Sequence, residues 1–184
     1  RFSLEERNER LRELRSRIAA LADATDETIV RQRLAWWDEV ADLEKLRGEV
    51  DEALRIREEE ELPAYRRLGD SRSAAVTQGQ IADILQNRGQ LDEALRIREQ
   101  EQLPVFRCLG AIRSIAATQC KIAEILQDRG QFDLALRILE EEALPFSLAE
   151  EPLALEILFR AALEGLSLIF WEEPRLFLPS CESS

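Results

Sequence analysis

The sequence predicts an all-α protein, built as an α-α solenoid of stacked helical hairpins. Two consecutive segments, residues 48–88 and 89–129, align without a gap and are identical at 26 of 41 positions. Apolar residues recur within each segment at the spacing of amphipathic helices, and a glycine stands where each predicted helix should stop. Because one such unit cannot bury its apolar side alone, consecutive copies are expected to stack into a continuous core.

Residues 1–23 are expected to form an N-terminal capping helix. Ser3 and Glu6 have the spacing of a capping box, in which each side chain bonds a backbone N–H of the first turn. The segment also carries one apolar stripe, made of Leu4, Leu11, Leu14, Ile18 and Leu21. A helix with one such stripe can close a core while its polar side stays in water.

Residues 24–47 predict a longer helix, which is the first helix of unit one. Trp36 and Trp37 are adjacent within it, and neighbouring residues of a helix point to different sides. We expect one of these indoles to lie in the core and the other to be available for a partner.

Three repeat segments follow, over residues 48–88, 89–129 and 130–170. Each contains the second helix of one unit and the first helix of the next. In the middle segment the apolar pattern predicts helices that end at Gly110 and at Gly130. Residues 171–184 form a tail, so the whole chain, 1–184, is expected to be a single domain.

Each predicted second helix contains an interior proline, at Pro63, Pro104 and Pro145. Proline cannot donate a backbone hydrogen bond, and its ring clashes with the carbonyl four residues earlier. The sequence therefore predicts a kink or a one-residue bulge just before each proline.

Acidic runs on the second helices could in principle supply catalytic or metal-binding carboxylates. They recur with the repeat, however, and arginines stand three or four residues away, at Arg55, Arg57, Arg96 and Arg98. This spacing favours ion pairs on the helix surface.

The composition excludes several classes of function. A net charge of −12 disfavours nucleic acid as the partner, because phosphates need a positive surface. The chain has no histidine, and its three cysteines lack C-x-x-C spacing, so we expect no metal, cofactor, disulfide framework or catalytic triad, and no enzymatic activity. No secretion signal is visible, which favours the cytoplasm. Because methionine is absent even at position 1, the chain is expected to be part of a longer protein.

Apolar residues nearly encircle a predicted helix over residues 152–171. Charges at Glu156, Arg160 and Glu164 argue against a membrane span. Two interpretations stay open. The helix packs on the preceding unit beneath the tail, or it forms a homodimer or domain-docking surface. The residues expected in such an oligomer interface are Phe159, Leu163, Leu166, Ile169 and Phe170.

Several of these features together resemble the tetratricopeptide repeat (TPR) family. The resemblance rests on a set that recurs around Gly48 and Gly130 and is clearest as Ala82, Leu85, Gly89, Leu91, Asp92, Glu93 and Ala94. The period of 41 residues exceeds the usual 34 and is similar to the longer repeats of kinesin light chain. Gln78 and Gln119 replace an aromatic residue that is usual in the family. The resemblance implies a right-handed superhelix and a scaffold for a protein or peptide partner, as one segment of a larger, bacterial-type regulatory protein.

The resemblance also implies that the first helices line a concave binding surface. By register from the turn glycines, its residues are Asp38, Asp42, Lys45, Gly79, Asp83, Gln86, Asn87, Cys120, Glu124, Gln127 and Asp128, and Trp37 is a further candidate for a contact with the partner. This strip is mostly acidic and largely lacks the family's Lys, Arg and Asn clamp for carboxylates, so a basic or neutral partner is expected. In the alternative interpretation, these side chains merely keep a helix face solvated.

Overall fold

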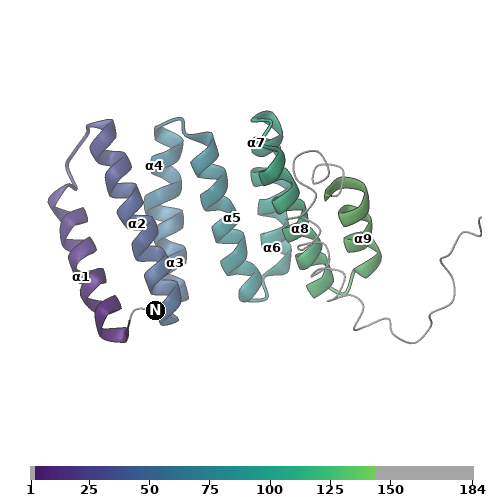
Figure 1. Cartoon of the computed structure of the whole chain (residues 1–184), viewed down its shortest axis with the longest axis horizontal. Helices are drawn as coiled ribbons and strands as arrows, with labels where there is room; N and C mark the ends of the chain where they lie inside the picture. Colours follow the sequence, from purple (N-terminus) through teal and green to yellow (C-terminus); the bar gives the residue numbers. More distant parts are fainter. Residues whose placement is uncertain (1–2, 144–184) are drawn as a thin grey trace, which may run out of the picture.

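The computed structural model describes residues 3–143, and every regular element among them is helical. The elements lie side by side in a row that follows the chain (Figure 1). In order they are α1 (Leu4–Ala20), α2 (Glu27–Arg47), α3 (Val50–Arg55), η1 (Ile56–Glu61), α4 (Leu62–Arg67), α5 (Ser71–Asn87), α6 (Leu91–Arg96), η2 (Ile97–Gln102), α7 (Leu103–Cys108), α8 (Ile112–Asp128), α9 (Phe132–Arg137) and η3 (Ile138–Ala143).

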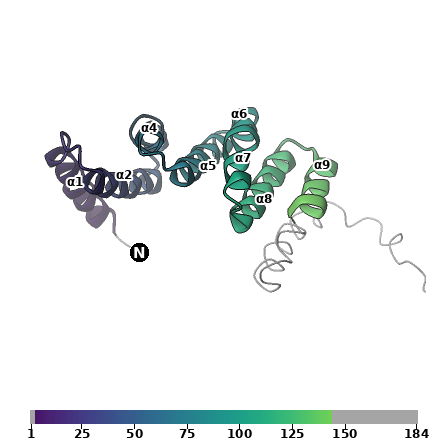
Figure 2. The same cartoon turned by 90° about the horizontal axis from the view of Figure 1, so that it is seen from above.

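The helices alternate between two sides of the row. The elements α3, η1 and α4 follow one another without a break and form the second helix of unit one, and α6, η2 and α7 do the same in unit two. Seen from above, α4 and α6 of these second helices lie on one side, whereas α5 and α8 lie on the other (Figure 2). Each helix packs on its neighbours along the chain, as α1 does on α2 and α5 on α6. This progression confirms the predicted all-α solenoid.

The predicted helix ends are found close to where the sequence places them. The capping box is present, because Ser3 and Glu6 exchange side-chain-to-backbone hydrogen bonds. The helix α2 begins three residues later than expected, since the Asp26 carboxylate caps the N–H groups of Thr28 and Ile29. At the far end of α5, Gly89 takes a φ of 76°, which a side chain would strain.

The π-helical elements confirm the bulge predicted before the prolines. The element η1 ends two residues before Pro63, and η2 ends two residues before Pro104. Wider i→i+5 turns suit this place, because proline cannot donate and pushes away the carbonyl four residues earlier. A third π-helical turn, η3, closes the described part, and Pro145 lies outside it.

Small residues line the places where the two helices of a unit meet. Ala53, Ala82, Ala94 and Ala135 are fully buried, which allows close approach of the backbones. The N-terminal stripe is shorter than predicted. Leu11, Leu14 and Ile18 are buried, whereas Leu4 is 64% exposed and Leu21 is half-buried.

Candidate binding surface on the first helices

Polar side chains of α2, α5 and α8 form a continuous surface, called here the first-helix face. Its members are Asp38, Asp42, Gln80, Asp83, Lys121 and Glu124. Arg57 reaches this surface from η1 and joins α2 to α5 through hydrogen bonds to Asp38 and Gln80. Further along, residues of α5 and α8 border a common hollow, so the surface continues across the units.

Arg57 is almost fully buried and lies at the centre of an acidic cluster formed by Asp38, Asp42 and Glu61. Its Nη1 donates to Asp38 Oδ1 at 2.9 Å, to Gln80 Oε1 at 2.7 Å and to Glu61 Oε2 at 3.2 Å. Its Nη2 donates to Asp42 Oδ1 at 2.6 Å. Three carboxylates thus share one guanidinium, and the cluster carries surplus negative charge.

Glu61 is the buried member of this acidic cluster. Its side chain is 1% exposed, and its Oε1 has no hydrogen-bond partner among the described residues. Burial raises the pKa of Glu61 to about 7, although the nearby Arg57 acts in the opposite direction. The other two carboxylates reach solvent, since the side chains of Asp38 and Asp42 are 47% and 60% exposed.

Unit two repeats this arrangement with fewer acids. The buried Arg98 donates to Asp83 Oδ1 at 2.5 Å, to the Gly79 carbonyl at 3.2 Å and to Gln102 Oε1 at 2.7 Å. Its Nε has no acceptor within residues 3–143. Burial lowers the pKa of Arg98, against the attraction of Asp83.

Gly79 lets the Gln102 amide lie directly against α5. A Cβ at residue 79 would stand 2.1 Å from Gln102 Nε2, which is far inside any real contact. The equivalent positions of unit one are Asp38 and Glu61, which both accept a hydrogen bond from Arg57. The glycine and the glutamine therefore form a matched pair.

Unit three has no buried cation at this position. Leu139 stands where Arg57 and Arg98 stand in the earlier copies, and it is 1% exposed within an apolar cluster. Cys120 packs against that cluster, and burial raises the pKa of its thiol. The layer beneath the first-helix face thus changes from acidic to balanced to apolar along the stack.

The prediction of surface ion pairs is wrong for two of the four arginines, Arg57 and Arg98, which are buried. Arg55 and Arg96 do form partly exposed pairs with Glu52 and Glu93 on their own helices. Arg57 and Arg98 instead point between the helices, because the first helices supply carboxylates that can compensate a buried guanidinium.

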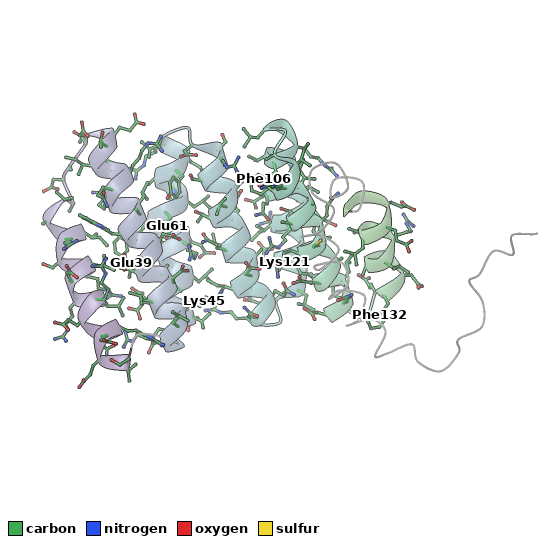
Figure 3. All side chains as sticks on the ribbon, in the orientation of Figure 1. Glu39, Lys45, Glu61, Phe106, Lys121 and Phe132 are labelled. Carbon is green, nitrogen blue, oxygen red and sulfur yellow. The ribbon has the colours of Figure 1, made fainter. Side chains whose placement is uncertain are left out.

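A hollow of about 270 Å³ lies between α5 and α8. Lys121, at its rim, pairs with Glu124 at 2.6 Å. Phe106 of α7 and Lys121 of α8 both border this hollow (Figure 3). The lining residues are Val76, Gly79, Gln80, Asp83, Arg98, Gln102, Phe106, Ser114, Ala117, Thr118 and Lys121.

The structure brings together only part of the predicted strip. Asp38, Asp42, Asp83 and Glu124 share the first-helix face, and sequence reasoning missed Gln80 and Lys121 beside them. A separate bond at 2.7 Å joins Gln86 of α5 to Asp128 of α8. The remaining predicted residues Lys45, Asn87 and Gln127 lie near the ends of their helices.

Trp37 lies on the other flank of α2, away from the acidic cluster. It lines a cleft of about 520 Å³ with residues of α1, α3 and η1, including Ile18 and Glu60. The expectation of one buried and one free indole is wrong, because Trp36 and Trp37 are both half-buried against the core of α1 and α2. The Arg17 guanidinium lies 5.8 Å from the ring centroid of Trp36.

Other predicted features are not described by the structure. The oligomer-interface residues Phe159, Leu163, Leu166, Ile169 and Phe170 lie outside residues 3–143. In the described part, no group of three or more His, Cys, Asp or Glu side chains could hold a metal ion. None of the helices placed in this range is long and apolar enough to cross a membrane.

The arrangement of these helices matches solved structures. A crystal structure of a kinesin light chain-like protein of Podosopora anserina, with nearly identical TPR-like repeats, matches with a TM-score of 0.63. This chain has a TPR-like solenoid fold. The match covers 90% of this chain and 87% of that chain at 20% sequence identity, so the likeness concerns the fold. No protein-family model matches the sequence of this chain, and no curated protein matches it either.

Proposed function

We propose that this TPR-like solenoid is a protein-interaction scaffold whose first-helix face binds a segment of a partner protein through a basic residue. The observation that carries the proposal is the acidic cluster, in which Asp38, Asp42 and Glu61 surround a single Arg57. Because the cluster has more carboxylates than cations, a second cation would balance its charge. A lysine or arginine of the partner would supply it.

The accessible atoms of the cluster suit such a ligand. Asp38 and Asp42 each use Oδ1 to hold Arg57, and both side chains remain about half exposed. Because a guanidinium can bridge two carboxylates, a partner arginine could bind them without disturbing Arg57. The net charge of −12 adds long-range attraction for a basic segment and repels nucleic acid.

The repeat architecture supports a peptide or protein ligand over a small molecule. Stacked units expose an extended surface that a segment of several residues can follow. The first-helix face spans α2, α5 and α8, so a bound segment could contact more than one unit. A setting in the cytoplasm, within a longer regulatory protein, belongs to the same proposal.

The test measures binding of two labelled peptides, one lysine-rich and one glutamate-rich, by fluorescence anisotropy. The double variant Asp38→Asn/Asp42→Asn keeps oxygen acceptors for Arg57 but removes two charges. It should weaken binding of the lysine-rich peptide about tenfold, as expected for two partly exposed charge pairs.

The matched control is Glu59→Gln/Glu99→Gln, which removes two exposed charges from the second helices. It should change the affinity less than about threefold. An equal loss in both double variants would mean attraction by net charge alone. That result, or a preference for the glutamate-rich peptide, would contradict the proposed function.

A further inference from the structure

The acidic cluster and the hollow occupy the same place in consecutive units, yet their chemistry differs. Asp38, Glu61 and Gln80 of the first site correspond, one period later, to Gly79, Gln102 and Lys121 of the second. Each substitution removes an acid or adds a cation. The second site is therefore less acidic than the first.

The charges around the hollow are already paired with one another. Arg98 binds Asp83, and Lys121 binds Glu124. An acidic ligand would meet the Asp83 carboxylate, and a basic ligand would meet the Arg98 guanidinium and the Lys121 ammonium, because all three side chains line the hollow. Uncharged groups avoid both costs.

Apolar surface is available in the same hollow. Val76 is 45% exposed although it is a large hydrophobic residue, and Phe106 and the exposed Ala117 also line the hollow. An aliphatic side chain seated there would cover Val76 and would keep water from the Arg98–Asp83 pair.

We infer that the hollow between α5 and α8 binds an aliphatic side chain of the same partner segment that places its basic residue on the acidic cluster. The inference rests on the proposed function and specifies its ligand. The two subsites would select a segment with one cationic and one aliphatic residue at a fixed separation.

The separation follows from the spacing of the helices. The cluster lies over α2 and the α2–α5 junction, and the hollow lies between α5 and α8. The first helices pack on η1 and η2 rather than directly on one another, so their axes stand farther apart than the about 8–10 Å of a packed pair, and the subsites are separated by roughly 10–15 Å. An extended segment advances about 3.3 Å per residue, which gives a spacing of roughly three to four residues.

The experiment selects binders from a random peptide display library on the full chain and sequences the enriched pool. The expected pool carries Lys or Arg with Leu, Ile or Val three or four positions away. Val76→Ser and Ala117→Gln should remove the aliphatic preference and leave the basic one. Asp38→Asn/Asp42→Asn should do the reverse, and Leu109→Ser, at an exposed leucine outside the hollow, should change neither.

The outcomes separate the two proposals. Enriched peptides that are basic but have no aliphatic residue at a fixed spacing would overturn the inference and leave the proposed function intact. An aliphatic preference that survives both Val76→Ser and Ala117→Gln would place that subsite elsewhere and would also overturn it. A pool without basic residues, or no enrichment, would overturn the proposed function and the inference with it.

Discussion

Glu61 and Gln102 occupy the same place one period apart, and each accepts a hydrogen bond from the buried arginine of its own π-helical turn. Unit one thus buries an acid where unit two buries its uncharged amide counterpart. This difference gives the protein a pH-dependent stability whose sign can be worked out.

Stability should fall as the pH rises through the range in which Glu61 ionises. The folded protein raises the pKa of Glu61 from 4.5 to about 7, so the folded state binds this proton more tightly than the unfolded state. The shift corresponds to about 3 kcal/mol, present in full near pH 4 and lost by about pH 8. Urea unfolding of Glu61→Gln should show a flatter pH profile than the parent, and Gln102→Glu a steeper one. Parallel profiles in all three proteins would contradict the assignment.

Loss of Arg57 should cost more than loss of Arg98. Arg57→Leu leaves two partly exposed carboxylates and the buried Glu61 without their cation, which predicts a loss of about 3–5 kcal/mol at neutral pH. Arg98→Leu leaves one carboxylate without its cation, that of the partly exposed Asp83. It also introduces the residue that the third copy has at the equivalent position, Leu139. The free energy of unfolding should therefore fall by only about 1–2 kcal/mol. Chemical denaturation of both variants measures the difference, and equal losses would refute it.

Gly79→Ala should destabilise the protein through Gln102. The new Cβ would displace the buried amide that accepts from Arg98, at a cost of about 1–3 kcal/mol. In the third copy, Cys120 is equivalent to Gly79 and Ala143 is equivalent to Gln102. A side chain at the first position thus occurs together with a short residue at the second. Gly79→Ala/Gln102→Ala should therefore lose less than the sum of its single variants in a double-mutant cycle. Strict additivity would show that the two positions are independent.

Trp37→Gln should leave the affinity for the lysine-rich peptide unchanged within about twofold, because the indole lies on the far flank of α2. Glutamine is also the native residue one period later, where Gln78 donates to Glu101 at 2.5 Å. Peptide titration followed by anisotropy would check this. A tenfold loss would instead include the Trp37 cleft in the binding surface.

Sequence reasoning found the elements because their signals are local. A capping box, a turn glycine or an interior proline acts within a few residues, so Ser3, Gly89 and Pro104 each predicted the backbone around them. The first-helix acids Asp38 and Asp83 followed from the register of the repeat.

The buried arginines were missed because their partners Asp42 and Asp83 lie on other helices, which the spacing along one helix does not reveal. Arg57 has acidic neighbours four residues away, which fits a surface pair equally well. One signal was nevertheless present in the chain. Leu139 at the equivalent position of the third copy indicates that this side of the helix faces the core.

The change from Arg57 to Arg98 to Leu139 along the stack also affects the order in which the repeats unfold. As the pH rises toward neutrality, ionisation of the buried Glu61 destabilises the unit around η1, whereas the apolar unit has Leu139 in the cluster and no carboxylate at the position of Arg57. At raised pH, amide hydrogen exchange should therefore be fastest around η1 and should spread to the neighbouring units from there. The pH would then determine which repeat unfolds first.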